Sequence, residues 1–178
     1  MRNWFGQYSN GASQRSEPGP GAVVPLLVAE PAKDIGFNLG APGGASKAEV
    51  IISDEEIDYP KAIAVDLLLA LTQAAADKYG RDLKPSGILV VDSTKVAKVP
   101  NGAFAVYRLP SIDTARGAVG KAMVANIVSL GVIAGLSEAV SREALEQAVL
   151  ARVPKGTEEL NRRALEAGFA LAGSPKAA

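Results

Sequence analysis

Residues 43–60 read GGASKAEVIISDEEIDYP, a run that joins a glycine pair, a strand and an acidic turn in a fixed order. Gly43 and Gly44 have no Cβ, so the backbone there can take a positive φ and come close to a ligand or a neighbouring chain. The next segment, 48–53 (AEVIIS), predicts a strand, because β-branched residues favour a pleated and packed surface. Its three consecutive apolar residues indicate burial on both faces, as in a parallel sheet.

The acidic turn at residues 53–58 carries the carboxylates Asp54, Glu55, Glu56 and Asp58. Mutual repulsion and hydration normally keep such a cluster in water. The alternative to a solvated turn is that the four carboxylates bind a metal, but the chain has no histidine or cysteine to complete a transition-metal shell. We therefore expect a solvated turn and no metal site.

Composition limits the function further. A chain of 178 residues suits one domain with a sizeable core. Its 19 Lys and Arg residues equal its 19 Asp and Glu residues, so it lacks the positive field that non-specific binding of nucleic acid needs. Without Cys or His it supplies no thiolate to an iron-sulfur cluster and lacks the usual general base near neutral pH. We expect redox chemistry to occur on another polypeptide.

Two segments bear on membranes and secretion. The start, MRNWFGQYSN, has no apolar signal core, and the most apolar later segment is interrupted by Lys121 and Asn126. The sequence therefore predicts a cytoplasmic chain that binds no membrane and no nucleic acid.

Residues 1–42 differ from the rest of the chain. Five prolines punctuate them, and Pro25 and Pro31 interrupt a stretch with the residue mixture of an amphipathic helix. An interior proline costs about 3 kcal/mol through a lost hydrogen bond and a steric clash. We interpret 1–42 as an atypical N-terminal segment that is either divergent or mis-assigned, for example through a reading-frame error. A mass spectrum that contains residues 19–33 as written would exclude mis-assignment.

From residue 48 onward, strand-like and helix-like patterns alternate, which predicts an α/β fold with a mainly parallel sheet. Thr72 is expected to cap a helix that ends at Gly80. The expected elements are strands at 66–71, 87–92 and 103–109, a helix at 73–79, and a turn at 83–87.

The last third reads as helical. Asp113 is expected to cap one long helix to about Leu136, whose glycines must be offset by close packing against the sheet or a partner chain. Ser141 and Thr157 are the expected caps of two further helices, and Pro154 ends the first of these. Residues 174–178 are expected to form a frayed tail.

Three ordered segments carry a resemblance to a known family: 43–60, residues 66–93 (DLLLALTQAAADKYGRDLKPSGILVVDS), and the tail formed by VANIVSLGVIAGL (124–136) and VSREALEQAVLARVPKGTEELNRRALEAGF (140–169). Together they resemble the gamma subunits of 2-oxoacid:ferredoxin oxidoreductases, a family that includes pyruvate and ketoisovalerate enzymes. The resemblance is closest to the 2-oxoglutarate branch.

The resemblance implies a three-layer α/β/α Rossmann-like domain over residues 43–173, with a mainly parallel sheet and a helical C-terminal segment. It implies partners in the form of alpha and beta subunits, with a delta subunit as a further candidate. Thiamine diphosphate, iron-sulfur clusters and CoA are implied for the complex, and none of them is bound by this chain alone. The implied reaction converts 2-oxoglutarate, CoA and oxidised ferredoxin into succinyl-CoA, CO2 and reduced ferredoxin, while pyruvate and branched-chain 2-oxoacids remain open as substrates.

The candidate cofactor-binding residues are Gly43, Gly44, Ala45, Ser46 and Lys47, and no catalytic residue is assigned. Successive N–H groups could bind an oxygen of a ligand or partner, and Lys47 could pair with a CoA phosphate. The alternative is a simple turn followed by a solvated lysine. The family's glycine-rich GGQG turn has only Gly19-Pro-Gly21-Ala22 as a counterpart here, which places CoA binding at that turn in doubt.

Other polar residues have two interpretations each. Asp92-Ser93-Thr94 ends a strand, where it could face a ligand, but a helix cap is favoured. Asn126 could bond across a subunit interface or locally, and Tyr59 is expected to pack rather than react. The alternative functions are a free-standing CoA- or nucleotide-binding module and a purely structural scaffold subunit.

Overall fold

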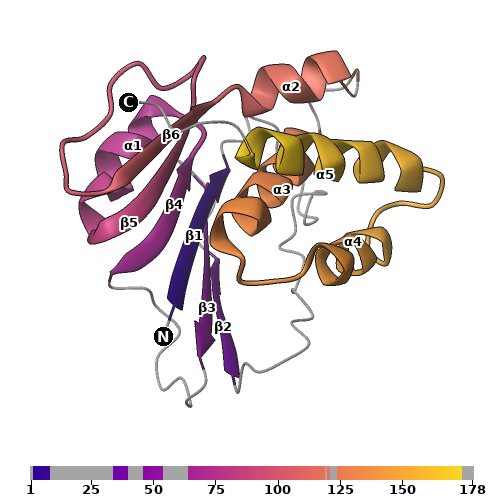
Figure 1. Cartoon of the computed structure of the whole chain (residues 1–178), viewed down its shortest axis with the longest axis horizontal. Coiled ribbons are helices and arrows are strands. Elements are labelled where there is room, and N and C mark those ends of the chain that lie inside the picture. The colour runs from indigo at the N-terminus through magenta and orange to yellow at the C-terminus, as the bar shows by residue number, and fades with distance from the viewer. Residues whose placement is uncertain are drawn as a thin grey trace. The chain divides into compact units, whose positions relative to one another are not determined.

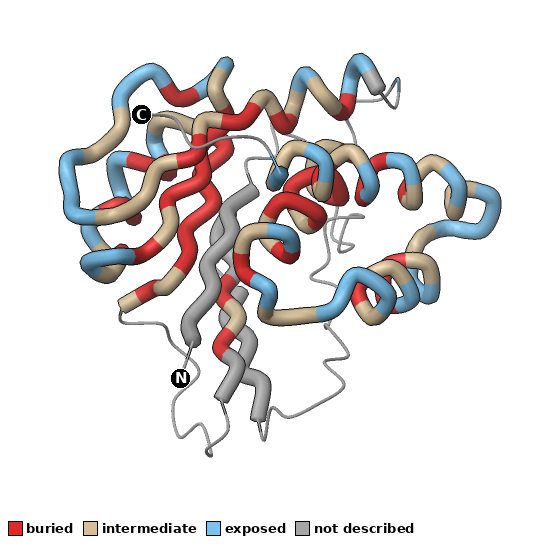
Figure 2. The backbone as a smooth tube through the Cα atoms, viewed as in Figure 1, coloured by how far each residue is buried: buried red, intermediate tan, exposed pale blue. Residues whose placement is uncertain are grey.

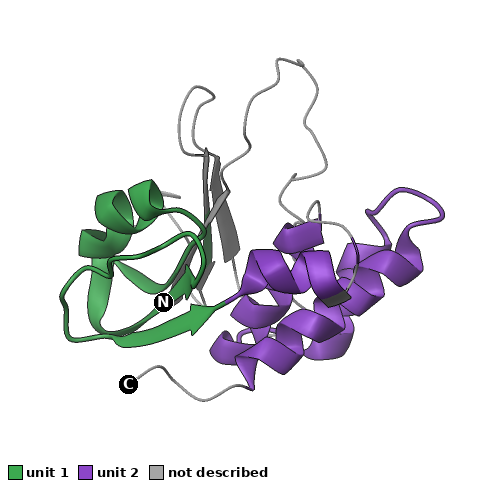
Figure 3. Ribbon diagram, turned by 90° about the horizontal axis from the view of Figure 1, so that it is seen from above, with its two compact units in different colours: residues 1–12, 30–109, 176–178 green, residues 13–29, 110–175 purple. Residues whose placement is uncertain are grey.

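The computed structural model describes residues 2–8, 34–39, 46–53, 64–118, 120 and 124–173. Within these residues the chain has an α/β fold (Figure 1). It divides into two compact units (Figure 3), which are unit 1, comprising Met1–Ala12, Glu30–Leu109 and Lys176–Ala178, and unit 2, comprising Ser13–Ala29 and Pro110–Pro175.

Unit 1 contains a sheet of six strands in the order β2-β3-β1-β4-β5-β6. Strands β1, β4, β5 and β6 run parallel, whereas β3 is antiparallel to both β1 and β2. The mainly parallel sheet expected from the sequence is thus confirmed. The bounds are Arg2–Tyr8 (β1), Asp34–Leu39 (β2), Ser46–Ser53 (β3), Val65–Ala70 (β4), Leu83–Asp92 (β5) and Ala105–Leu109 (β6).

The strand expected at 48–53 is confirmed as part of β3, but the parallel setting expected for it is wrong. Burial in β3 follows from its position between β1 and β2, whichever way the strand runs. Glu49 and Ile51 are buried, and Val50 between them is half-buried. The run of apolar residues therefore correctly indicated an interior strand, but it did not indicate whether that strand is parallel or antiparallel to its neighbours.

The core of unit 1 lies between the sheet and helix α1 (Gln73–Tyr79). Leu68 and Leu89 belong to this core, and Leu67 and Val90, which alternate with them along β4 and β5, are buried too. Figure 2 shows that burial runs along these strands. Burial on both faces explains why these parallel strands read as continuous apolar runs without polar alternation. The buried members of the cluster are Ile51, Val65, Leu68, Ala70, Ala75, Ala76, Tyr79, Leu83, Leu89, Val91 and Val96.

The turn predicted at 83–87 is wrong, because these residues lie within β5. The register of β5 against β4 shifts between Val65 and Leu67, which marks a bulge. Ser86 has φ of 63°, and its N–H donates to a carbonyl in the loop before β6 (2.6 Å). The proline and glycine beside it thus distort the strand locally without ending it, since a bulge tolerates the missing donor of proline.

The described part of unit 2 is helical. Helices α2 and α3 are separate, so the single helix predicted from Asp113 to Leu136 is wrong. Gly120 lies between them with φ of 76°, a left-handed conformation that a helix cannot continue through. Asp113 lies in the first turn of α2 and is not its cap. The helices are α2 (Ser111–Ala118), α3 (Ala125–Ser137), α4 (Arg142–Leu150) and α5 (Glu158–Ala172).

Glycines allow α3 and α5 to touch backbone to backbone. A Cβ on Gly168 would overlap the carbonyl oxygen of Val128 and lie 2.9 Å from the Cα of Gly131. The close packing expected of the glycine-rich helix is therefore confirmed at Gly131, but its neighbour there is α5 of the same chain and not the sheet or a partner chain as expected. Gly117, in α2, has no atom within 4 Å of the corresponding position.

The helix caps predicted at Thr72 and Ser141 are confirmed. The hydroxyl of Thr72 accepts the N–H of Ala75 (3.3 Å), and that of Ser141 accepts the N–H of Ala144 (3.1 Å). The cap expected at Thr157 is wrong, because its hydroxyl donates to the carbonyl of Pro154 (2.7 Å) and accepts no backbone N–H at the start of α5. Instead, this hydroxyl accepts Nδ2 of Asn161 (3.1 Å).

Replacing Ser141 by alanine is expected to lower the free energy of unfolding by about 1 kcal/mol, because the N–H of Ala144 loses its acceptor. Urea unfolding measures the change. Ser141→Asp keeps an oxygen acceptor and should lie near the wild type. Equal losses for the two variants would contradict a capping role for Ser141.

Candidate functional site

Two of the predicted site residues, Ser46 and Lys47, lie at one edge of the sheet. Gly43, Gly44 and Ala45 lie outside the described residues, and Ser46 and Lys47 begin β3. Their backbones pair with Tyr8 and Gln7, at the C-terminal end of β1. Because β3 runs antiparallel to β1, its first residues lie at the carboxyl edge of the parallel strands.

The register extends this edge across the sheet. Gln7 pairs with Ala70 at the end of β4, Ala70 pairs with Val91, and Val91 pairs with Arg108. Lys47 of β3 thus shares one row with the C-terminal ends of β1, β4, β5 and β6. Open α/β sheets bind ligands outside this edge, so we take it as the candidate site.

At the end of β5, Asp92 holds a tight turn. Its carboxylate is fully buried, and Oδ1 accepts the N–H of Thr94 (3.0 Å) and the hydroxyl of Thr94 (2.6 Å). Its carbonyl accepts the N–H of Val96 (3.0 Å), and the N–H of Ser93 donates to the carbonyl of Leu109 (3.0 Å). The helix cap expected at Asp92-Ser93-Thr94 is wrong, since a turn and a loop follow β5 and no helix does.

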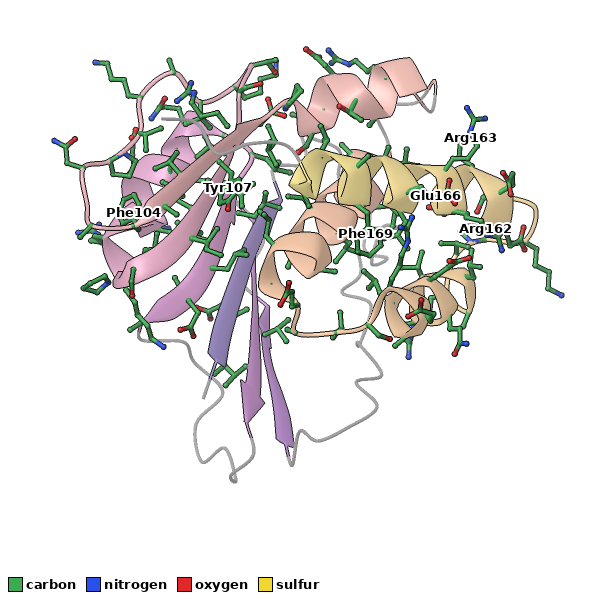
Figure 4. All side chains as sticks on the ribbon, in the orientation of Figure 1. Phe104, Tyr107, Arg162, Arg163, Glu166 and Phe169 are labelled. Carbon is green, nitrogen blue, oxygen red and sulfur yellow. The ribbon has the colours of Figure 1, made fainter. Side chains whose placement is uncertain are left out.

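The loop after this turn, residues 93–104, is fixed to its neighbours. Val96 is fully buried in the core of unit 1, and its carbonyl accepts Nη2 of Arg108 (2.6 Å). Gln73, the first residue of α1, accepts the N–H of Lys98 (2.9 Å) and donates to its carbonyl (2.8 Å). Phe104, at the far end of the loop (Figure 4), packs on the same core. This loop was not predicted as part of the site, although Val96 and Val99 within a polar stretch are a recognisable anchoring pattern.

In unit 2, charged side chains of α4 and α5 make contacts within and between these helices. Arg162 of α5 binds Glu146 of α4 (2.8 Å) and Glu159 one turn away (3.0 Å), and its hydrogen bond to Glu146 is the largest cause of its raised pKa. The guanidinium of Arg142 lies 4.6 Å from the ring centre of Phe169. The contacts of Arg162 with Glu146 and of Arg142 with Phe169 join α4 to α5, which is a structural role. Figure 4 labels Arg162 and Phe169 on α5. Asn126 lies half-buried in α3.

The chemistry that the described residues offer at the carboxyl edge is binding by N–H, hydroxyl and ammonium donors. No group of three or more acidic, histidine or cysteine side chains capable of holding a metal occurs in the described part of the chain. No helix among the described residues is long and apolar enough to cross a membrane. Tyr59 and the acidic turn at 54–58 lie outside the described residues.

Comparisons with known sequences point in one direction. Residues 37–171 match the pyruvate ferredoxin/flavodoxin oxidoreductase family. The chain is 46% identical over 134 residues to 2-oxoglutarate synthase subunit KorC of Methanocaldococcus jannaschii, which covers 74% of this chain and 72% of the relative. It is 35% identical over 131 residues to ketoisovalerate oxidoreductase subunit VorA of Methanothermobacter thermautotrophicus, which covers 71% of this chain and 27% of the relative.

Solved structures agree with the sequences. The gamma subunit of a keto/oxoacid ferredoxin oxidoreductase from Geobacter sulfurreducens matches with a TM-score of 0.78 and 38% identity, over 97% of this chain and 98% of that one. The 2-oxoglutarate:ferredoxin oxidoreductase from Magnetococcus marinus, with 2-oxoglutarate, coenzyme A and succinyl-CoA bound, matches with a TM-score of 0.75 over 98% of this chain and 31% of that one. At 18% identity, this second match shows the fold alone.

Proposed function

The chain belongs to the pyruvate ferredoxin/flavodoxin oxidoreductase family, and from this premise we propose that it is the gamma subunit of a 2-oxoglutarate:ferredoxin oxidoreductase. The family membership confirms the resemblance drawn from the sequence motifs. The choice of 2-oxoglutarate rests on one observation, the 46% identity over 134 residues to a 2-oxoglutarate synthase subunit, against 35% over 131 residues to a ketoisovalerate subunit.

In this proposal the complex converts 2-oxoglutarate, CoA and oxidised ferredoxin into succinyl-CoA, CO2 and reduced ferredoxin. Thiamine diphosphate and the iron-sulfur clusters are bound by alpha and beta subunits, with a delta subunit as a further candidate. The cysteine-free sequence of this chain supports that division, because iron-sulfur clusters are normally held by thiolates. The chain itself serves assembly and lies near CoA, without a catalytic residue of its own, in the cytoplasm.

The proposed cofactor contact is residues 43–47. Support comes from the register, which places the backbones of Ser46 and Lys47 at the carboxyl edge of the parallel strands. The proposed family domain, residues 43–173, nearly coincides with the family match over 37–171. Gly43, Gly44 and Ala45, which precede β3 in the sequence, complete the proposed contact.

Affinity purification of the tagged chain from native extract tests the function. We expect chains that carry thiamine diphosphate and iron-sulfur clusters to co-purify, and the complex to reduce ferredoxin when given 2-oxoglutarate and CoA. Pyruvate and ketoisovalerate, assayed in parallel, should support at most about a tenth of that rate.

Two results would contradict the proposal. A monomer that retains CoA would favour a free-standing binding module, and a complex without 2-oxoacid activity would favour a structural scaffold. A faster reaction with pyruvate or ketoisovalerate would keep the subunit assignment and overturn the choice of substrate.

A further inference from the structure

We propose that loop 93–104 is an anion-binding loop, in which Lys95 and Lys98 hold the phosphate-bearing end of CoA. This inference rests on the proposed function and extends its cofactor site from the start of β3 to the end of β5. The ligand class is a small molecule with several phosphate groups, and CoA carries a diphosphate and a 3′-phosphate.

The charge of the loop is the first argument. Lys95 and Lys98 are its only charged residues, and both are exposed. Neither forms an ion pair with any residue that the structure describes. The two other lysines of unit 1 whose side chains the structure describes are engaged, since Lys84 binds Asp66 (2.9 Å) and Lys78 lies 5.0 Å from the ring centre of Tyr79. The loop therefore presents two ammonium groups whose donors are open to a ligand.

The rigidity of the loop is the second argument. The buried carboxylate of Asp92 fixes the turn before Lys95, and Gln73 binds both backbone groups of Lys98. Between them, Val96 anchors the loop in the core. The backbone that carries both lysines is thus ordered before any ligand arrives, which lowers the entropic cost of binding.

Position is the third argument. The loop leaves β5 at the carboxyl edge, where Ser93 and Thr94 add hydroxyl groups. Lys47 begins β3, which is separated from β5 by three strand spacings, roughly 14 Å at about 4.8 Å per spacing. Two cationic positions at that separation along one edge suit an elongated ligand such as CoA.

The mixed charge beside the loop favours a small ligand over an acidic protein. Helix α1, which is bonded to the loop through Gln73, exposes Asp77 one turn further along. Asp82 follows α1 and is half-exposed. Lys78 and Arg81 are exposed beside these carboxylates, so the charges around α1 are mixed in sign, whereas an acidic protein partner would require a broad positive face.

The test uses the assembled complex and measures the KM for CoA during ferredoxin reduction. The double variant Lys95→Gln/Lys98→Gln is expected to raise this KM about tenfold, with kcat and the KM for the 2-oxoacid unchanged. Lys95→Arg/Lys98→Arg keeps both charges and should stay within about twofold of the wild type. The matched control is Lys78→Gln/Lys155→Gln, which removes two exposed lysines elsewhere and should leave the KM unchanged.

Pantetheine, which lacks the phosphates, gives a second measurement. Wild type and Lys95→Gln/Lys98→Gln should use it equally poorly, because the lysines then have no phosphate to bind. An unchanged KM for CoA in an intact complex would overturn the proposal. Loss of partner chains from the variant complex would overturn it too, in favour of a subunit contact. A wild-type complex that consumes no CoA would refute the proposed function itself.

Discussion

Gly168→Ala is expected to lower the free energy of unfolding by about 3 kcal/mol, at the upper end of the usual range for overpacking. A Cβ at this position overlaps the carbonyl oxygen of Val128, which is backbone of α3 and cannot rotate away. Relief requires the two helices to separate, and that opens the cluster of Val128, Leu165 and their neighbours. The melting temperature should fall by roughly 6 to 12 °C for a chain of this length.

A graded glycine series provides the control. Gly117→Ala places the same methyl group in open space on a helix, so it should stabilise the protein by up to about 1 kcal/mol. Gly135→Ala meets the Cβ of Ala172 at 2.6 Å, near the end of α5, where the chain can yield, and should fall between the two. Gly131→Leu should cost at least as much as Gly168→Ala, because its added carbons meet the carbonyl of Leu165. Equal melting temperatures for Gly117→Ala and Gly168→Ala would contradict the backbone contact.

The helices and strands whose ends are set by residues adjacent in the sequence were predicted correctly. Helix α1 begins after Thr72 and ends at Tyr79 as expected, because a hydroxyl cap and a following glycine lie in the adjacent sequence. Strand β4 and the second half of β5 were likewise predicted from apolar runs. Strands β1 and β2 were not predicted. Both depend on pairing with β3, and the proline-rich sequence of residues 1–42 has no local pattern that indicates a strand.

The errors at Ser86 and Gly120 have a common cause. Both residues have positive φ. The turn chemistry at 83–87 predicted a break that is only a bulge, whereas Gly120 was predicted to lie within one continuous helix and marks a break. Whether such a residue ends an element or only distorts it depends on tertiary contacts. The ladder with β4 carries β5 through its bulge at Ser86, whereas the break at Gly120 leaves α2 and α3 as separate helices.

The candidate site shows the same limit. Residues 43–47 were chosen for their glycines and lysine, but only the antiparallel register of β3 places Ser46 and Lys47 at the carboxyl edge. Loop 93–104 was missed because its fixing bonds join Gln73 to Lys98, 25 residues along the chain. No sequence pattern within the loop indicates that Gln73 is its partner.

Asp92→Ala is expected to lower the free energy of unfolding by about 2 to 3 kcal/mol, since hydrogen bonds to a charged group contribute about 1.5 to 3 kcal/mol each. The N–H and hydroxyl of Thr94 lose their buried acceptor, and the exposed position of Thr94 lets water replace part of it. Asp92→Asn keeps the shape and one oxygen acceptor, so its loss should be about half as large. Urea unfolding measures both changes.

The same variant separates the order of the loop from its charge. Asp92→Ala leaves Lys95 and Lys98 in place but releases the turn that positions them, so the KM for CoA should rise several-fold although no positive charge is lost. If Asp92 acts through the lysines, adding Asp92→Ala to Lys95→Gln/Lys98→Gln should raise the KM little further, because contacts that share one partner are not additive. A fully additive increase would place the effect of Asp92 elsewhere on the carboxyl edge. The Asp92→Ala complex could assemble, be less stable and still have the wild-type KM for CoA. That result would show that Lys95 and Lys98 bind CoA without a preformed loop.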